Sequence, residues 1–207
     1  MNSSLSPIKA LHEHASHLGI LVGYRFIGTD DDLNLFPEEA AALRNAVAKV
    51  RRQSGAARAV ARTLFRQLGI PACAILKAGS GAPVWPAGIV GSLAHDGTVA
   101  IAAVARNNGG LSIGIDIEAD EPMPPELAKL VATPNERRQY ASSVLNSRQL
   151  FVVKEAVYKA SFPIDEKFLD FQDVEVDLAT NLAHTCHGAS FKFFLSRGPY
   201  LSALAIA

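Results

Sequence analysis

The hydrophobic pattern of the first half of the chain predicts helical structure over residues 36–69. Apolar residues recur there at steps of three and four, which is the spacing of a helix with one buried face. Pro37 suits the first turn of this segment, and Gly69 followed by Pro71 ends it. We expect Gly55 to divide the segment into two helices.

Short runs of small and β-branched residues predict strands. TVAIAAVA (residues 98–105) and SIGIDIE (residues 112–118) flank the turn sequence NNGG, so we expect them to form a β-hairpin that ends the first half. The Gly- and Pro-rich stretch over residues 79–92 predicts a loop before them.

The second half predicts helices followed by strands. The expected helices cover residues 125–131, 134–145 and 147–161, and the expected strands lie near residues 171–178, 189–196 and 200–207. The last strand, in GPYLSALAIA, repeats the character of GTVAIAAVA, where small residues also follow a glycine turn. This similarity predicts an internal duplication, and therefore an α+β fold of two similar halves, residues 1–111 and 112–207.

Composition and charge narrow the class of protein. A chain of 207 residues with 49% hydrophobic residues forms one large or two small globular domains. Twenty basic and twenty acidic residues give a formal net charge of zero, so the overall charge favours neither nucleic acid nor a membrane surface as a partner. Any anion-binding site must be local.

The sequence also bears on the compartment. Its start lacks a basic stretch followed by an apolar core, and its apolar runs are too short to cross a bilayer, so we expect a cytoplasmic protein. Cys73 and Cys186 form no CxxC pair, which favours two reduced thiols over a disulfide.

Two carboxylates interrupt the apolar run SIGIDIE. Asp116 and Glu118 are two residues apart and so share one face of a strand, whereas the isoleucines take the other face. Like charges this close need a partner, because an unpaired buried carboxylate is costly and tends to protonate. Either this is an edge strand with one face in water, or a divalent cation or a basic cluster keeps both carboxylates ionised.

A helix of the second half carries an acid and a base together. In RQLFVVKEAVYKA, Glu155 and Lys159 are four residues apart and therefore neighbours on one helix face. The same spacing is common in surface ion pairs of little energetic value. The spacing alone therefore leaves both interpretations open.

An arginine ladder lies on the predicted helix of the first half. Arg58, Arg62 and Arg66 stand at steps of four on one helix face, with Arg51 and Arg52 just before them. Such a ladder without interleaved glutamates repels itself, which favours an anion-binding role over a solvated face.

Ser92 and His95 lie between glycines in GSLAHDG, at the entry of the first predicted strand. A lone histidine there is more often a structural hydrogen-bonding group than a catalyst. The turn at Gly91 would nevertheless bring backbone N–H groups close to an anion. Carboxylates, arginines and a histidine together predict Mg²⁺, or Mn²⁺ in its place, bound with a phosphate-bearing substrate.

Two histidine-rich stretches, HEHASH and HTCH, offer competing metal sites. The histidines and cysteine concerned are His12, His14, His17, His184, Cys186 and His187. Neither stretch has a complete ligand set, so an exposed helix and an exposed loop are the preferred interpretations.

The order and spacing of these segments resemble the Sfp-type 4′-phosphopantetheinyl transferases, in the branch similar to the enterobactin synthase component. The resemblance runs from about Arg52 to Val176 through SGAARAVARTLFRQLG, GAPVWPAGIVGSLAHDG, IGIDIE, TPNER and FVVKEAVYKASFP followed by FLDFQDVEV. GIDIE and KEAVYKA at this separation are its most specific part. The resemblance implies transfer of phosphopantetheine from coenzyme A to a serine of an acyl or peptidyl carrier protein, with release of adenosine 3′,5′-bisphosphate. It also implies two pseudo-symmetric α+β halves with the site between them, most naturally as a monomer.

The resemblance assigns the acidic and basic residues of the second half. Asp116, Glu118 and Glu155 match the family's metal ligands, so Mg²⁺ on the coenzyme A diphosphate would keep the carboxylate pair ionised. Lys159 matches the lysine near the diphosphate, which is suited to stabilising charge on the leaving bisphosphate. Glu155 is also a candidate to accept the serine proton, directly or through metal-bound water.

The resemblance assigns the first half to coenzyme A. Ser92 and His95 match residues that contact its phosphates, and Arg52, Arg58 and Arg62 lie where the family places basic phosphate contacts.

Two positions depart from the branch pattern. Gly81 stands where an arginine usually precedes the Ala-Pro of the WP loop, and a valine follows the phenylalanine in FVVKE, where a small or polar residue is common. Neither is a metal ligand, so we expect activity with weaker coenzyme A binding, unless a residue such as Arg25 supplies the contact.

Two other functions share much of this inventory. A Mg²⁺-dependent phosphoesterase would use similar residues, and an inactive carrier-protein-binding module would keep only the docking surface. Retention of all three carboxylates and Lys159 argues against the second. Siderophore, nonribosomal peptide, polyketide and fatty acid carriers all remain candidate partners, and the branch favours the siderophore type.

Overall fold

The computed structural model describes residues 6–107, 109–140 and 144–207. The chain divides into two compact units, one of residues 12–109 and the other of residues 1–11 with 110–207. Helix α1 (Ser6–Ser16) contains the boundary between residues 11 and 12. Both units combine helices with antiparallel sheets, which confirms the predicted α+β class.

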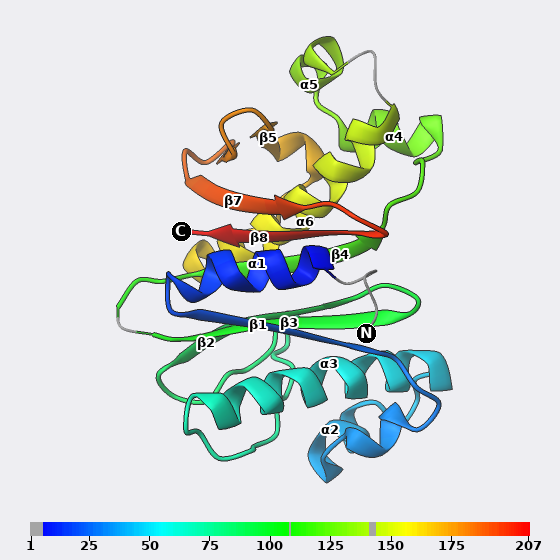
Figure 1. Ribbon diagram of the computed structural model, residues 1–207, viewed down its shortest axis with the longest axis vertical. Helices are drawn as coiled ribbons and strands as arrows, with labels where there is room; N and C mark the ends of the chain where they lie inside the picture. Colours follow the sequence, from blue (N-terminus) through cyan, green and yellow to red (C-terminus); the bar gives the residue numbers. More distant parts are fainter. Residues whose placement is uncertain (1–5, 108, 141–143) are drawn as a thin grey trace. The chain divides into compact units, whose positions relative to one another are not determined.

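The unit of residues 12–109 packs one long helix on a three-stranded sheet of order β1–β3–β2 (Figure 1). Its elements are β1 (Ile20–Phe26), the 3-10 helix η2 (Asp31–Asn34), α2 (Pro37–Ala42), α3 (Ala48–Gln67), β2 (Ile89–His95) and β3 (Val99–Arg106). The core forms where Val60, Leu64 and Phe65 of α3 pack with Ala102 and Val104 of β3. Burial of these apolar side chains is the main force that holds the helix on the sheet.

The predicted segment 36–69 is divided into two helices, α2 and α3, but not at Gly55, because α3 runs through that residue without a break. The glycine is required by packing instead, because a Cβ atom there would lie 1.9 Å from the carbonyl oxygen of Asp31 in η2. Helix α3 and η2 therefore approach each other at a point that accepts no larger residue.

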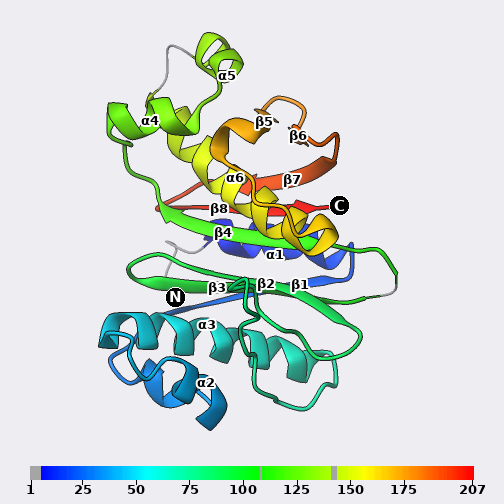
Figure 2. The same ribbon diagram turned by 180° about the vertical axis from the view of Figure 1, so that it is seen from behind.

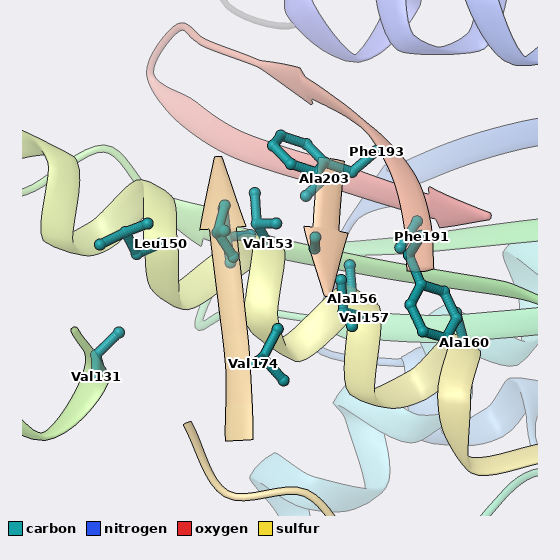
Figure 3. Close-up of a cluster of buried hydrophobic side chains, with 14 of the residues drawn as sticks. Val131, Leu150, Val153, Ala156, Val157, Ala160, Val174, Phe191, Phe193 and Ala203 are labelled. Atoms are coloured by element: carbon teal, nitrogen blue, oxygen red, sulfur yellow. The ribbon is translucent and has the colours of Figure 1, made fainter. Parts of the chain in front are cut away.

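The unit of residues 1–11 and 110–207 packs helix α6 on a five-stranded antiparallel sheet of order β4–β8–β7–β6–β5 (Figure 2). Its elements from residue 110 onward are β4 (Ile113–Ala119), α4 (Pro125–Val131), α5 (Pro134–Gln139), α6 (Val144–Asp165), the 3-10 helix η3 (Phe171–Asp173), β5 (Val174–Asp177), β6 (Leu182–Thr185), β7 (Ser190–Ser196) and β8 (Tyr200–Ile206). Figure 3 shows its core, in which Val153, Ala156 and Val157 of α6 pack with Phe193 of β7 and Ala203 of β8.

Most second-half elements follow the hydrophobic pattern, but β6 was not predicted, and the helix predicted over residues 134–145 ends at Gln139 as α5. Helix α4 has the predicted bounds, and α6 extends to Asp165 rather than ending at residue 161. Part of the predicted helix 134–145, residues 141–143, lies outside the described residues. Among the helices in the described part of the chain, none has both the length and the hydropathy needed to cross a membrane.

The predicted hairpin between β3 and β4 is wrong, because the two strands belong to different sheets. The hairpin of this region joins β2 to β3, and β2 lies partly within the stretch predicted as a loop. Its turn is fixed by Asp96, whose Oδ1 accepts hydrogen bonds of 2.6 Å from the backbone N–H groups of Thr98 and of Val99. Asn108 of the NNGG turn lies outside the described residues.

Gly114 allows α6 to lie directly on β4. A Cβ atom at this position would be 1.9 Å from the carbonyl oxygen of Ala156 and 2.5 Å from the backbone nitrogen of Ala160. Residues two and four positions along a strand point to the same face. Asp116 and Glu118 therefore face α6.

Candidate active site

Asp116 meets a basic side chain of α6. Its Oδ1 lies 2.6 Å from Nζ of Lys159, which also donates a hydrogen bond of 3.3 Å to the carbonyl oxygen of Ile115. Asp116 is only 6% exposed, and a charged pair interacts more strongly away from water. The structure thus provides the cationic partner that the paired carboxylates require.

Glu118 meets a second basic side chain of the same helix, one that the sequence analysis missed. Its Oε2 lies 3.1 Å from Nη1 of Arg148. Arg148 precedes Glu155 by seven residues and Lys159 by eleven, which places all three on one face of α6. The seven-residue spacing to Glu155 is the sequence feature that indicates a site role for Arg148.

Glu155 lies on this helix face between the two cationic residues. It is partly buried, and burial raises the pKa of its carboxyl group above the ordinary value. The charge of Lys159 opposes this shift and that of Asp116 adds to it. A carboxyl group with a raised pKa is a better proton acceptor than an exposed one.

We refer to Asp116, Glu118, Glu155, Arg148 and Lys159 as the carboxylate cluster. Its acidic oxygens are the donor type that Mg²⁺ prefers, and this ion commonly completes its shell with water and phosphate oxygens. Within the described residues, no group of three or more His, Cys, Asp or Glu side chains has an arrangement that could hold a metal ion. The donor chemistry fits Mg²⁺, but Asp116 and Glu118 contact cationic side chains here, so binding one ion through all three carboxylates would require them to converge.

In the unit of residues 12–109, two arginines of the ladder contact the buried side chain of Glu39. Arg62 Nη1 lies 2.9 Å from Glu39 Oε1, and the same oxygen accepts a hydrogen bond of 2.6 Å from the backbone N–H of Ile75. Arg58 Nε donates to the carbonyl oxygen of Ile75 at 2.9 Å and is 3.5 Å from Glu39 Oε1. Burial lowers the pKa of Arg58, an effect that Glu39 opposes.

This geometry gives the two arginines a structural task. Arg58 is 4% exposed and Arg62 is 8% exposed, whereas Arg66 on the next turn is exposed. Their predicted contact with coenzyme A phosphates stays a prediction, and it would have to coexist with the bonds to Glu39.

Arg52 and His95 lie on elements that meet at one end of the sheet. Gln53, next to Arg52 in α3, donates a hydrogen bond of 2.9 Å to the carbonyl oxygen of Asp96, next to His95. Arg52 is partly buried and His95 is exposed. Ser92 is buried on the opposite face of β2 from His95, because an odd separation along a strand changes the face.

Gly81 has a backbone reason to be glycine. Its φ angle is +90°, a conformation that residues with a Cβ atom rarely adopt. The turn is closed by its N–H, which donates to the carbonyl oxygen of Ala78 at 2.9 Å. The departure from the branch pattern therefore accompanies a turn that favours glycine.

Two models of known protein families match the chain, one in each half. The family model of the 4′-phosphopantetheinyl transferase N-terminal domain matches residues 38–105. The family model of the 4′-phosphopantetheinyl transferase superfamily matches residues 112–205. The chain belongs to the 4′-phosphopantetheinyl transferase superfamily. This confirms the predicted family and the enzyme class, a phosphopantetheinyl transferase.

Several transferases from other organisms are similar to this protein. It is 36% identical over 184 residues to 4′-phosphopantetheinyl transferase Svp of Streptomyces mobaraensis, over 85% of this chain and 71% of Svp. It is 37% identical over 153 residues to 4′-phosphopantetheinyl transferase PptT of Mycobacterium tuberculosis, over 72% of this chain and 67% of PptT. Enterobactin synthase component D of Escherichia coli K12 is 39% identical over 97 residues, which cover 44% of this chain and 45% of that protein.

Proposed function

We propose that this transferase moves the 4′-phosphopantetheine group of coenzyme A to a serine of an apo acyl or peptidyl carrier protein in a Mg²⁺-dependent reaction. Adenosine 3′,5′-bisphosphate is the other product. The observation that carries the proposal is the contact between Lys159 and Asp116, with Glu155 beside it, in the region matched by the superfamily model.

The proposed metal ligands are Asp116, Glu118 and Glu155. Their carboxylate oxygens suit Mg²⁺, and two of them lie on the face of β4 that meets α6. When bound, the ion would neutralise charge on the diphosphate and so favour departure of the bisphosphate.

The protein's own groups carry the proton and the leaving charge. Glu155 accepts the proton of the carrier serine, directly or through a water, and its raised pKa supports this role. The serine oxygen then bonds to the phosphorus that bears the pantetheine arm, and the bond from that phosphorus to the bisphosphate oxygen breaks. Lys159 stabilises the negative charge that this oxygen gains.

Side chains from the unit of residues 12–109 would contact the phosphates of coenzyme A. We propose Arg52, Ser92 and His95 for this role, together with Arg58 and Arg62. The hydrogen bond from Gln53 to the carbonyl oxygen of Asp96 supports the pair Arg52 and His95 most directly, because these two residues are the neighbours of Gln53 and Asp96 in the sequence.

We propose a carrier of siderophore, nonribosomal peptide or polyketide synthesis as the protein substrate. Similarity to enterobactin synthase component D supports the siderophore type. We further propose that the enzyme acts in the cytoplasm as a monomer.

The test is incubation with coenzyme A, Mg²⁺ and a panel of apo carrier proteins, followed by intact-mass measurement. We expect one phosphopantetheine to be added to at least one carrier, and none to a carrier whose acceptor serine is alanine. Release of free phosphopantetheine without a carrier would instead indicate a phosphoesterase. Carrier binding without any mass change would indicate an inactive binding module.

A further inference from the structure

Arg148 makes a set of contacts that the proposed function does not use. Its Nη1 lies 3.1 Å from Oε2 of Glu118, its Nε donates to the carbonyl oxygen of Glu121 at 3.2 Å, and its Nη2 lies 3.5 Å from that of Pro122. Two backbone carbonyls thus hold the guanidinium group in place at the end of β4. Its planar fork is suited to such a multiple contact.

The order of contacts along β4 and α6 explains why this arginine reaches Glu118. Gly114 meets Ala160 and Ala156, Asp116 meets Lys159, and Glu118 meets Arg148. The strand and the helix therefore run in opposite directions, and these three strand residues have their counterparts in α6. Arg148 is the last of these counterparts, close to the helix start at residue 144.

We propose that Arg148 is a positioning residue for Glu118 as a ligand of the divalent cation. This inference rests on the metal site of the proposed function. A carboxylate held at one oxygen by a fixed guanidinium can bind a cation through its other oxygen without losing the first contact. Groups that orient metal ligands in this way raise metal affinity.

The opposite effect of Arg148, a lower metal affinity, also has a physical basis. The sign of the effect therefore tests the proposal. A positive charge beside a cation site repels the cation, so a guanidinium that merely neutralised Glu118 would lower metal affinity. Anchoring of Arg148 to two backbone carbonyls favours orientation, because these two contacts do not involve the carboxylate that would bind the cation. The sign of the change in metal affinity on removing Arg148 decides between the two roles.

The experiment measures binding of Mn²⁺ alone to the chelator-treated protein, by loss of the electron paramagnetic resonance signal of the free ion. We expect Arg148→Ala to raise the Mn²⁺ Kd by about tenfold to a hundredfold. Arg148→Lys should fall between wild type and Arg148→Ala, because one ammonium group cannot reach the carboxylate and both carbonyls at once. In Glu118→Ala, adding Arg148→Ala should raise the Kd no further.

Arg137 supplies a matched control. Its Nη1 donates to the carbonyl oxygens of Lys129 at 2.8 Å and Ala132 at 3.0 Å, both in the same unit and neither in the carboxylate cluster. Arg137→Ala removes an arginine clamp of the same kind, so we expect it to leave the Mn²⁺ Kd unchanged.

The outcomes separate failure of the inference from failure of the metal site. An unchanged or lower Kd in Arg148→Ala and Arg148→Lys, with Glu118→Ala still impaired, would overturn the role of Arg148 alone. Absence of Mn²⁺ binding to the wild type, or full binding to Glu118→Ala, would overturn both. Arg148→Lys keeps the test decisive if Arg148→Ala does not fold.

Discussion

At the residue scale, two of the three acids in the carboxylate cluster contact a base. Lys159 contacts Asp116 and Arg148 contacts Glu118, both within hydrogen-bond distance. Each pair joins a carboxylate of β4 to a cationic side chain of α6. The two cations have different expected tasks, because Lys159 has one anchor on the backbone and Arg148 has two.

Replacing Lys159 by alanine should lower kcat more than it raises the KM for coenzyme A. The lysine is proposed to act on charge that develops in the transition state, and loss of such a group lowers turnover by roughly a hundredfold or more. Steady-state kinetics with an active carrier measures both constants. An effect confined to KM would make Lys159 a binding residue only.

Gly81→Arg tests whether the usual arginine contact is missing here. Both Gly81→Arg and Gly81→Ala place a Cβ atom at φ +90°, so we expect each to lose about 1 kcal/mol of stability in urea unfolding. Only Gly81→Arg should lower the KM for coenzyme A, by about fivefold, the scale of one charge-assisted hydrogen bond. Equal KM values in the two variants would mean that no phosphate contact is restored.

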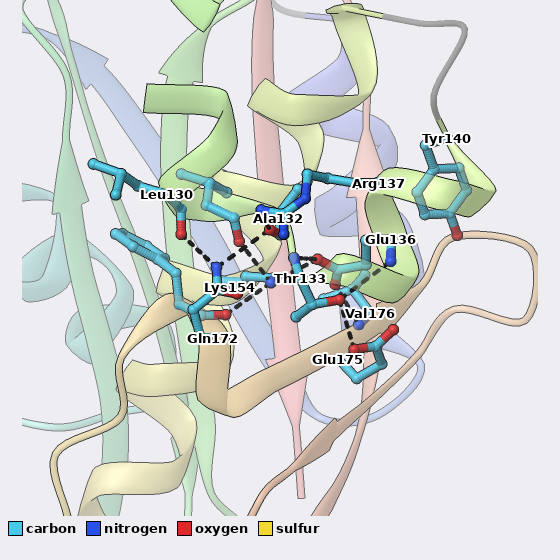
Figure 4. A network of polar contacts seen from close by, with 12 residues as sticks. Leu130, Ala132, Thr133, Glu136, Arg137, Tyr140, Lys154, Gln172, Glu175 and Val176 are labelled. Carbon is cyan, nitrogen blue, oxygen red and sulfur yellow. Dashed lines mark hydrogen bonds and ion pairs between the residues drawn. The ribbon is translucent and has the colours of Figure 1, made fainter. Parts of the chain in front are cut away.

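At the scale of elements, α6 joins the carboxylate cluster to the rest of its unit through Lys154. This residue is 1% exposed, and its Nζ contacts Glu136 Oε2 at 2.7 Å and the carbonyl oxygens of Val131 and Phe171, each at 2.8 Å (Figure 4). The three acceptors belong to α5, α4 and η3. One side chain therefore ties α6 to three neighbouring elements, one residue away from Glu155.

Glu136 completes this network from the other side. Its Oε2 accepts a hydrogen bond of 2.8 Å from the backbone N–H of Thr133, and its Oε1 accepts one of 2.8 Å from that of Val176 in β5. The TPNER and KEAVYKA segments of the sequence are thus joined by a buried ion pair with several further hydrogen bonds. Such a pair is far more costly to break than to replace as a whole.

Lys154→Met should destabilise the protein by about 3–5 kcal/mol, because it leaves the Glu136 carboxylate buried without its cation. The double variant with Glu136→Gln should recover much of this loss, since the buried charge is then absent. Urea unfolding followed by circular dichroism measures both. A Lys154→Met protein of native stability but with a raised KM for coenzyme A would contradict the structural role.

The arginine ladder allows a parallel test in the other unit. Arg62→Ala should cost about 3 kcal/mol or more, because Glu39 loses its closest cation and Phe36 loses a cation–π contact at 4.4 Å. Arg66→Ala, on the exposed side of the same helix, should change stability by less than about 0.5 kcal/mol. If Arg62→Ala instead kept full stability and only raised the KM for coenzyme A, a phosphate contact would be its main role.

At the scale of the whole molecule, local pattern predicted elements better than it predicted their partners. Helices α3, α4 and α6 follow from apolar periodicity, and Asp116, Glu155 and Lys159 follow from short motifs. The β3–β4 hairpin failed because adjacency along the chain does not decide which sheet a strand joins. Gly55 predicted a helix break wrongly, because its packing partner, Asp31, lies in a different segment of the sequence.

Arg148 shows the same limit at the candidate site. Its partner Glu118 is 30 residues away in the sequence, and a single arginine on a helix is usually solvated. The seven-residue spacing to Glu155 indicates a shared helix face, but only the contact with β4 shows which face that is. Tertiary contacts of this kind are not encoded in any local window of sequence.

Removal of the divalent cation should abolish transfer without unfolding the protein. The fold of the carboxylate cluster does not depend on a metal, because Lys159 contacts Asp116 and Arg148 contacts Glu118 without one. This differs from small metal-dependent domains, in which binding free energy is folding free energy. Circular dichroism and thermal melting of the chelator-treated enzyme should therefore show a cooperative native protein.

Returning Mg²⁺ should then stabilise that protein by mass action alone. At a concentration one hundred times its Kd, a cation that binds only the native state adds about 2.7 kcal/mol to the free energy of unfolding. The increment should disappear in Asp116→Ala, which removes a proposed ligand. An equal increment in Asp116→Ala would place the stabilising cation elsewhere, and unfolding on chelation would show that the two ion pairs do not suffice to hold the metal-free site.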